Sequence, residues 1–277
     1  MKHFGKSGPE LERFVHGAFE KGWVEAENRP SKSIVVFCAG FPLTGESRVF
    51  MTYGGTFKDV LTLTHELGHA FHNHAMKQVQ GMNKQYPMSV AETASTFAEM
   101  VILDAAIEAA DSREEKLFLL DEKLKRSAMN FMNVHSRFLF EKKFYQERKK
   151  GTVPASRLNE LMEEAMDKGY QGSLEGGSVH SWIWTPHFYI TNSPFYNFPY
   201  TFGYLFSLGI YAKAKENGEA FEQAYLALLR DSGKMSAEQL AAKHLGEDIT
   251  SETFWEKGLE MCRKDVEEFS RLSALLF

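Results

Sequence analysis

Residues 65–69 read His-Glu-Leu-Gly-His, and they lie within residues 57–78, where apolar side chains recur at helical spacing. On a helix, positions i and i+4 share one face, one turn apart. The imidazoles of His65 and His69 can therefore reach one zinc ion at about 2.0–2.1 Å. Glu66 is offset from that face by one residue, so its carboxylate can approach a water near the metal without binding the metal. The motif predicts two metal ligands and a general base.

The helix around this motif has a start signal at Thr56, with Asp59 as an acidic residue in the first turn. Gly68 lies in the helix interior, where glycine costs roughly 1 kcal/mol relative to alanine. A neighbouring backbone or a substrate that passes close to the helix would explain glycine here. The alternative interpretation of the motif is that both histidines are ordinary surface or core residues.

A catalytic zinc takes three protein ligands and leaves one position open. Glu92 is a candidate for the third ligand, because a helix predicted over residues 89–110 can pack antiparallel to the helix of residues 57–78. Ser89 and Glu92 also fit a capping box, in which Glu92 would fold back on the helix N-terminus. Spacing alone does not decide between the two roles. Glu99 lies seven residues further on the same face and could support a ligand imidazole.

Two further histidines follow the motif. His72 shares the helical face of His65, but three ligands on one straight helix rarely converge on one ion. We interpret His72 as a packing or supporting residue. His74 points to the opposite face, where a structural role is expected.

Length and composition are typical of a folded globular protein. The chain has 277 residues, of which 43% are hydrophobic and 25% charged, and we expect one catalytic domain over residues 1–277. The net charge of -5 gives no reason to expect a nucleic-acid partner. Two cysteines do not make a disulfide scaffold. No signal core and no run of about 18 apolar residues occurs, so no membrane span is expected and a cytoplasmic protein is the simplest interpretation.

The remaining pattern is mostly helical. Residues 33–37 and 48–53 read as two strands joined by a turn with Gly40, Pro42 and Gly45, which predicts a small sheet in the region of about 33–53. The glycine-rich residues 169–177 read as a loop. Helices are predicted over residues 8–23, 57–78, 89–110, 112–149, 154–168, 200–216, 218–230, 236–244 and 251–274. The fold class that follows is mostly α with a small β-sheet.

Aromatic residues gather in the segment of about 180–204. A tetrahedral intermediate of amide hydrolysis needs hydrogen-bond donors for its oxyanion, and tyrosine hydroxyls and a histidine are suitable. The alternative is that most of these tyrosines are core residues with one satisfied hydroxyl. The candidates are His187, Tyr189, Tyr196, Tyr200 and Tyr204.

The sequences HELGHAFH at 65–72 and AETASTFAE at 91–99 resemble peptidase family M3 of the zinc peptidases, in its oligoendopeptidase F branch. The resemblance extends to residues 48–56, 186–189 and 195–204. It implies a zincin-type catalytic domain with one zinc per chain, held by His65, His69 and Glu92. It further implies a zinc-dependent endopeptidase that hydrolyses oligopeptides with Glu66 as general base. His187, with Tyr196 and Tyr200, would bind substrate and stabilise the transition state.

Family members are longer than this chain, and their N-terminal half forms one wall of the substrate channel. We therefore expect association with a second copy of the chain or with a separate N-terminal half as partner. An inactive or partner-dependent truncated fragment that binds zinc without turnover is the alternative, and a non-peptidase metal hydrolase is a third. The strand ending at Tyr53 could offer an exposed edge on which a peptide substrate adds as a further strand.

Overall fold

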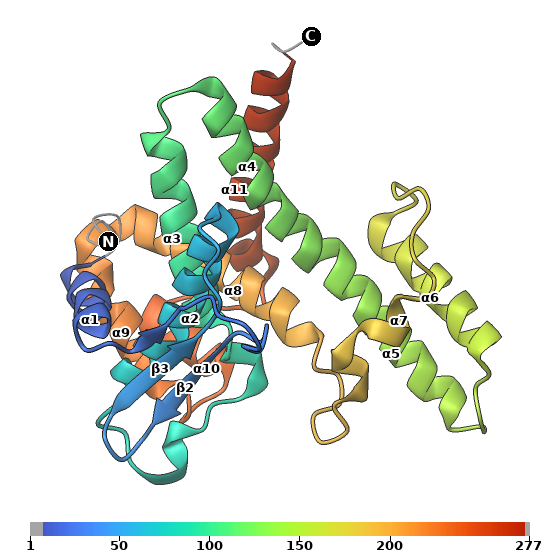
Figure 1. The fold of residues 1–277 in the computed structure, drawn as a ribbon, viewed down its shortest axis with the longest axis horizontal. Coiled ribbons are helices and arrows are strands. Elements are labelled where there is room, and N and C mark those ends of the chain that lie inside the picture. The colour runs from blue at the N-terminus through green and yellow to red at the C-terminus, as the bar shows by residue number, and fades with distance from the viewer. Residues whose placement is uncertain (1–7, 275–277) are drawn as a thin grey trace. The chain divides into compact units, whose positions relative to one another are not determined.

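The computed structural model describes residues 8–274, apart from the side chain of Glu219, and it divides the chain into two compact units (Figure 1). Unit 1 combines residues 1–120 with 203–277, and unit 2 is residues 121–202. The prediction of one domain over residues 1–277 does not anticipate this division. That both units serve one catalytic site stays a prediction.

The small sheet of unit 1 has three strands within the described residues: β1 (Val24–Glu25), β2 (Phe37–Phe41) and β3 (Glu46–Phe50). β3 lies in the centre, parallel to β1 and antiparallel to β2. The helix α2 (Phe57–Ala75) packs against β2 and β3 (Figure 1). The sheet and the helix that carries the His-Glu-Leu-Gly-His motif therefore form two packed layers.

The strand positions differ from the predicted ones. The side chain of Ile34 is 93% exposed, and residues 33–36 belong to no strand. Gly40, expected in the turn, lies inside β2, where it pairs with Ser47 of β3. A Cβ at Gly40 would come within 2.9 Å of the amide nitrogen of Asn73 on α2. The strand before Tyr53 ends at Phe50 and is the central one, so the prediction that it offers an exposed edge is wrong. The two edges of the sheet belong to β1 and β2.

The helices of unit 1 follow the predicted pattern closely. α2 begins after a capping box between Thr56 and Asp59, and α10 begins after one between Ser236 and Gln239. These helices pack around large buried side chains such as Phe97. Besides α2 they are α1 (Pro9–Glu20), α3 (Thr93–Ala109), the start of α4 (Arg113–Ala128), most of α8 (Phe198–Asn217), α9 (Phe221–Asp231), α10 (Ala237–Leu240) and α11 (Glu252–Ser273).

Unit 2 is built on two helices that pack against each other, α5 (Val134–Arg148) and α6 (Ala155–Tyr170). Their core contains Phe140, Leu161 and Met162. The long helix predicted over residues 112–149 is interrupted by a π-helical turn at Met129–Asn133, which separates α4 from α5. The short helices α7 (Ser181–Trp184) and η5 (Pro186–Tyr189) complete the unit.

Short turns of 3-10 or π helix connect the longer elements: η2 (Gly81–Lys84), η3 (Met88–Val90), η6 (Gly218–Ala220) and η7 (Ala241–Leu245). The predicted class, mostly α with a small β-sheet, is confirmed. Within residues 8–274, no helix combines the length and the apolar character needed to cross a bilayer.

Candidate metal centre

The two helices that carry the predicted ligands touch at backbone level. An ideal Cβ on Gly68 of α2 would lie 2.5 Å from the Cα of Ser95 and 2.6 Å from the carbonyl oxygen of Ala94, both on α3. Only glycine permits this approach without a shift of the helices. The close neighbour predicted from Gly68 is therefore the backbone of α3. The contact brings Glu92, at the start of α3, in front of the motif face of α2.

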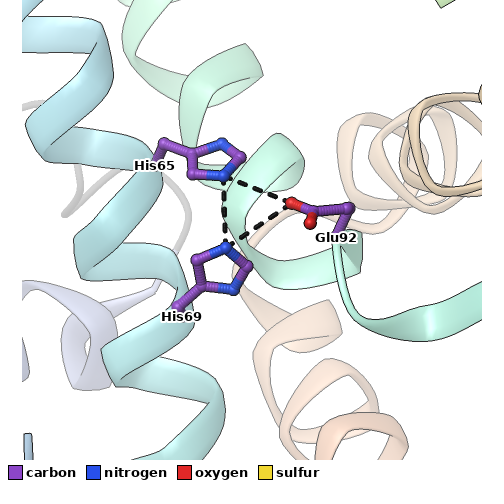
Figure 2. A group of neighbouring side chains, drawn as sticks. All are labelled: His65, His69 and Glu92. Carbon is purple, nitrogen blue, oxygen red and sulfur yellow. Dashed lines mark hydrogen bonds and ion pairs between the residues drawn. The ribbon is translucent and has the colours of Figure 1, made fainter. Parts of the chain in front are cut away.

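Three side-chain atoms converge at this contact (Figure 2). The Nε2 atoms of His65 and His69 lie 3.1 Å apart, and the Oε2 atom of Glu92 lies 3.2 Å from the first and 3.5 Å from the second. A tetrahedral ion with ligand bonds of about 2.0–2.1 Å requires ligand atoms roughly 3.3 to 3.4 Å apart. The donor set thus fits three ligands of one tetrahedral cation.

Glu92 is a buried carboxylate, and its side chain does not cap a helix. α3 begins at Thr93, and Glu92 occupies the position before it without a side-chain cap hydrogen bond. The capping-box interpretation of Ser89 and Glu92 is therefore wrong. The hydroxyl of Ser95 donates to Oε2 of Glu92 at 3.0 Å and so helps to fix the carboxylate. This role of Ser95 was not predicted from the sequence. Its position three residues after the candidate ligand Glu92 could have indicated it.

His65 is oriented by a second carboxylate. Its Nδ1 lies 2.5 Å from Oε1 of Glu99, which is buried at 5% exposure. A hydrogen bond from Nδ1–H to a carboxylate leaves the lone pair of Nε2 free for a metal. The expected supporting position of Glu99 agrees with this geometry.

The electrostatics of the centre favour a cation. Burial lowers the pKa of His65, but hydrogen bonds and charges from Glu92 and Glu99 outweigh burial and raise it to about 10. Burial raises the pKa of Glu92, yet hydrogen bonds from His65 and His69 bring it well below its usual range. The same negative potential that holds a proton on His65 would stabilise a divalent cation between the three ligand atoms.

Glu66 is buried beside the ligand set. Burial is the main cause that raises the pKa of its carboxyl, while the charges of His65 and His69 lower it. Cys38 on β2 lies within electrostatic reach, because the pKa of its thiol is raised to about 12 first by burial and then by the charge of Glu66. The charge of the base candidate is therefore felt at β2.

The other histidines of α2 lie outside the centre. His72 is fully buried, its Nε2 lies 2.8 Å from Oγ of Ser232, and its ring stacks on Tyr86. His74 lies 3.3 Å from a carboxylate oxygen of Glu10. Both therefore have packing partners away from the metal ligands, as the sequence pattern indicated.

Three of the five aromatic candidates, His187, Tyr196 and Tyr200, form a cluster within unit 2. Nε2 of His187 lies 3.3 Å from the hydroxyl of Tyr200, and its ring stacks on Tyr196 with centroids 6.0 Å apart. Tyr196 and Tyr200 meet edge to face at 5.9 Å. Burial lowers the pKa of His187, and the charge of Arg137 lowers it further, so the ring is neutral near pH 7. Tyr204 is buried in unit 1, and Tyr189 is 58% exposed.

Known proteins similar to this chain belong to a peptidase family. The model of the family described as peptidase family M3 matches residues 11–261. The chain is 26% identical over 271 residues to the chromosomal oligoendopeptidase F of Lactococcus lactis subsp. cremoris, and this match covers 96% of the chain and 44% of that relative. The chain therefore spans less than half the length of this relative.

Solved structures share the fold. A protein structure from Chlamydophila abortus matches with a TM-score of 0.80 and 25% identity over 98% of this chain and 46% of that one. The oligoendopeptidase-F structure from Enterococcus faecium matches with a TM-score of 0.62 and 21% identity, over 78% of this chain and 39% of that one. The Chlamydophila structure thus shares the fold over nearly the whole chain, and the Enterococcus structure shares it over the 78% that is matched.

Proposed function

The chain belongs to peptidase family M3, and we propose that it is a zinc-dependent endopeptidase that hydrolyses short peptides. The observation that carries this proposal is the convergence of His65, His69 and Glu92 with tetrahedral spacing beside the buried Glu66. Two imidazoles and one carboxylate suit zinc, whereas magnesium and calcium prefer oxygen ligands alone. When bound, zinc polarises a carbonyl and lowers the pKa of a water ligand to about 7.

Glu66 is the general base in this proposal. Its carboxylate would accept a proton from the attacking water and then donate that proton to the amine nitrogen that leaves. Burial raises the pKa of the Glu66 carboxyl above its usual range, which suits a group that must both accept and release a proton. Glu99 would act on the chemistry only through His65, by holding the ring in the tautomer that presents Nε2.

The cluster of His187, Tyr196 and Tyr200 would supply neutral hydrogen-bond donors to the oxyanion of the tetrahedral intermediate. The mutual contacts of the three rings within unit 2 support this role, because each ring limits the motion of the other two. A second role in binding the substrate backbone is compatible with the same donors.

The outer edge of β2 would bind the peptide backbone. β2 pairs only with β3 among the described strands, and its residue Cys38 lies within electrostatic reach of Glu66. A peptide added along this edge would form main-chain hydrogen bonds that do not depend on side-chain identity. This mode of binding fits substrates of varied sequence.

The proposal is tested with a quenched fluorescent peptide and metal analysis on the wild type and Glu66→Gln. We expect about one zinc per chain in both proteins, and peptide cleavage that falls by about 10²- to 10⁴-fold in Glu66→Gln. Equal cleavage rates in both proteins would rule out Glu66 as the base. Glu66→Gln preserves size and hydrogen-bonding capacity, so a change in folding is not expected to mimic the result.

A second candidate is a fragment that binds zinc without turnover. The observation that favours it is that the chain spans 44% of the Lactococcus relative. It predicts stoichiometric zinc with no cleavage by the wild type, and recovery of cleavage when an N-terminal half is added. Association with such a partner or with a second copy stays a prediction, which light scattering tests.

A further inference from the structure

Arg137, the fourth residue of α5, has a guanidinium without a partner among the described residues. The side chain is partly buried, and among residues 8–274 its guanidinium makes no hydrogen bond and no ion pair. Arg157 in the same unit shows the usual situation, since it pairs with the carboxylates of Glu147, Glu160 and Glu164 at 2.8 to 3.0 Å. A partly buried and unpaired guanidinium is costly, because its charge loses hydration without gaining an acceptor.

The neighbours of Arg137 on the same helical face show which parts of unit 2 lie near it. Asn133 and Glu141 lie four residues before and after it, so the three share one stripe of the helix. The amide of Asn133 donates to the hydroxyl of Tyr170 at 3.2 Å. Glu141 accepts from the backbone N–H of Phe195 at 2.8 Å. Arg137 therefore lies between two points at which this face contacts other parts of unit 2.

The second of these points adjoins the aromatic cluster. Glu141 also accepts from the side chain of Asn197 at 3.1 Å, so the residues on both sides of Tyr196 are tied to α5. Consistent with this placement, the charge of Arg137 acts on His187, and Tyr200 lies within its electrostatic reach. The unpaired charge thus lies within electrostatic reach of His187 and Tyr200, two of the rings that the proposed function places in contact with the substrate oxyanion.

Among the side chains that the structure describes, no carboxylate pairs with this charge. Glu141 is the acid nearest along the helix stripe, but its two oxygens already accept from Phe195 and Asn197. A guanidinium offers planar, paired N–H donors that match a carboxylate in a bidentate manner. The missing partner is therefore expected to come from a bound molecule.

We propose that Arg137 binds a carboxylate of the peptide substrate. The proposal rests on the proposed function, because it needs the cluster of His187, Tyr196 and Tyr200 to be in contact with substrate. The carboxylate has two sources, the C-terminus of the peptide or an Asp or Glu side chain. The C-terminus would make the enzyme sense the end of a short peptide, and a side chain would make it select acidic sequences.

The experiment compares matched peptide pairs on the wild type, Arg137→Met and the control Arg157→Met. One pair has the same sequence with a free C-terminal carboxylate or an amide, and a second set exchanges Glu for Gln at one internal position at a time. We expect the wild type to prefer one carboxylate-bearing member by about ten- to hundredfold in kcat/KM, the range for a charge-assisted hydrogen bond. This ratio should fall to near one in Arg137→Met and persist in Arg157→Met.

The ratio is internal to each protein, so a general loss of stability does not alter it. A preference in the C-terminal pair identifies the terminus, and one in the Glu and Gln set identifies a side chain. Indifference of the wild type to both, or equal preference in wild type and Arg137→Met, would overturn the proposal. A loss in Arg137→Met that is equal for both members would also overturn it, since the guanidinium would then serve a neutral group.

The same ratio is measured as Kd by fluorescence anisotropy with labelled peptides on the Glu66→Gln background, which needs no turnover. A preference in Kd that depends on Arg137 would support the carboxylate site. If the parent chain at the same time cleaved no peptide, only the proposed peptidase activity would be contradicted. Cleavage without any carboxylate preference counts against the Arg137 site alone. The two failures are thus distinguishable.

Discussion

Replacement of Gly68 by alanine should loosen the contact between α2 and α3. The new Cβ would lie 2.5 Å from the Cα of Ser95, and ordinary contact begins at 3.4 Å, so the helices must separate locally by 3.4 − 2.5 = 0.9 Å. The opposing atoms belong to the backbone and cannot rotate away as a side chain could. We therefore expect a cost near the upper end of the range for overpacking, about 3 kcal/mol. Better helix propensity returns roughly 1 kcal/mol, which leaves a net loss of about 2 kcal/mol.

The same shift should weaken metal binding. Glu92 directly precedes α3, so a movement of 0.9 Å changes its distance from His65 and His69. Metal sites tolerate errors in ligand distance of about 0.2 Å. We expect zinc affinity to fall by about ten- to hundredfold, as it does when supporting contacts of a metal ligand are removed.

The assay is urea unfolding of metal-free protein together with a zinc titration in competition with a chromophoric chelator. Gly17→Ala is the matched control, because Gly17 lies inside α1 and nothing lies within 4 Å of its ideal Cβ. This control should gain about 0.5–1 kcal/mol of stability without a change in zinc affinity. If Gly68→Ala behaved like Gly17→Ala, the close helix contact would not hold the ligands in place.

Three further predictions follow from the same geometry. Glu99→Gln should weaken zinc binding by about tenfold or more, because Nδ1 of His65 loses a charged acceptor; unchanged affinity in the chelator competition would contradict this. Burial lowers the pKa of His72 to about 3 in the folded protein. As the pH falls, His72 therefore binds a proton in the unfolded chain before it does so in the folded protein. The free energy of unfolding should fall between about pH 6.5 and pH 3, by up to about 1.4 kcal/mol per pH unit. His72→Gln should reduce that slope in urea unfolding at pH 7 and pH 5, and equal slopes would refute the assignment. Glu92→Gln should retain the fold but lose most zinc affinity, which metal analysis after dialysis measures.

Local signals in the sequence were sufficient for most helices. The capping boxes at Thr56 and Ser236 act within one turn, so the start of α2 and of α10 could be predicted without knowledge of the rest of the chain. Glycine at position 68 likewise indicated a close neighbour, although the sequence could not tell backbone from substrate. The shared helical face of the candidate ligands His65 and His69 followed from the same local periodicity.

Non-local contacts explain what was missed. β1 has only two residues, and its pairing with β3 comes from a distant part of the chain. Gly40 pairs with Ser47 of β3 and lies close to Asn73 of α2, and no residue next to it in the sequence signals these contacts. Glu92 had two equal interpretations from spacing, and only the position of α3 excludes the capping one. The unpaired charge of Arg137 becomes visible only when the contacts of α5 are known.

The most direct test of the metal centre is an X-ray absorption spectrum at the zinc edge of the zinc-loaded protein and of Glu92→Gln. We predict nitrogen and oxygen neighbours at about 2.0–2.1 Å, with the multiple scattering of two imidazoles, and an altered spectrum in Glu92→Gln. Sulfur neighbours at about 2.3 Å, or identical spectra for the two proteins, would contradict the assignment of His65, His69 and Glu92 as the ligands.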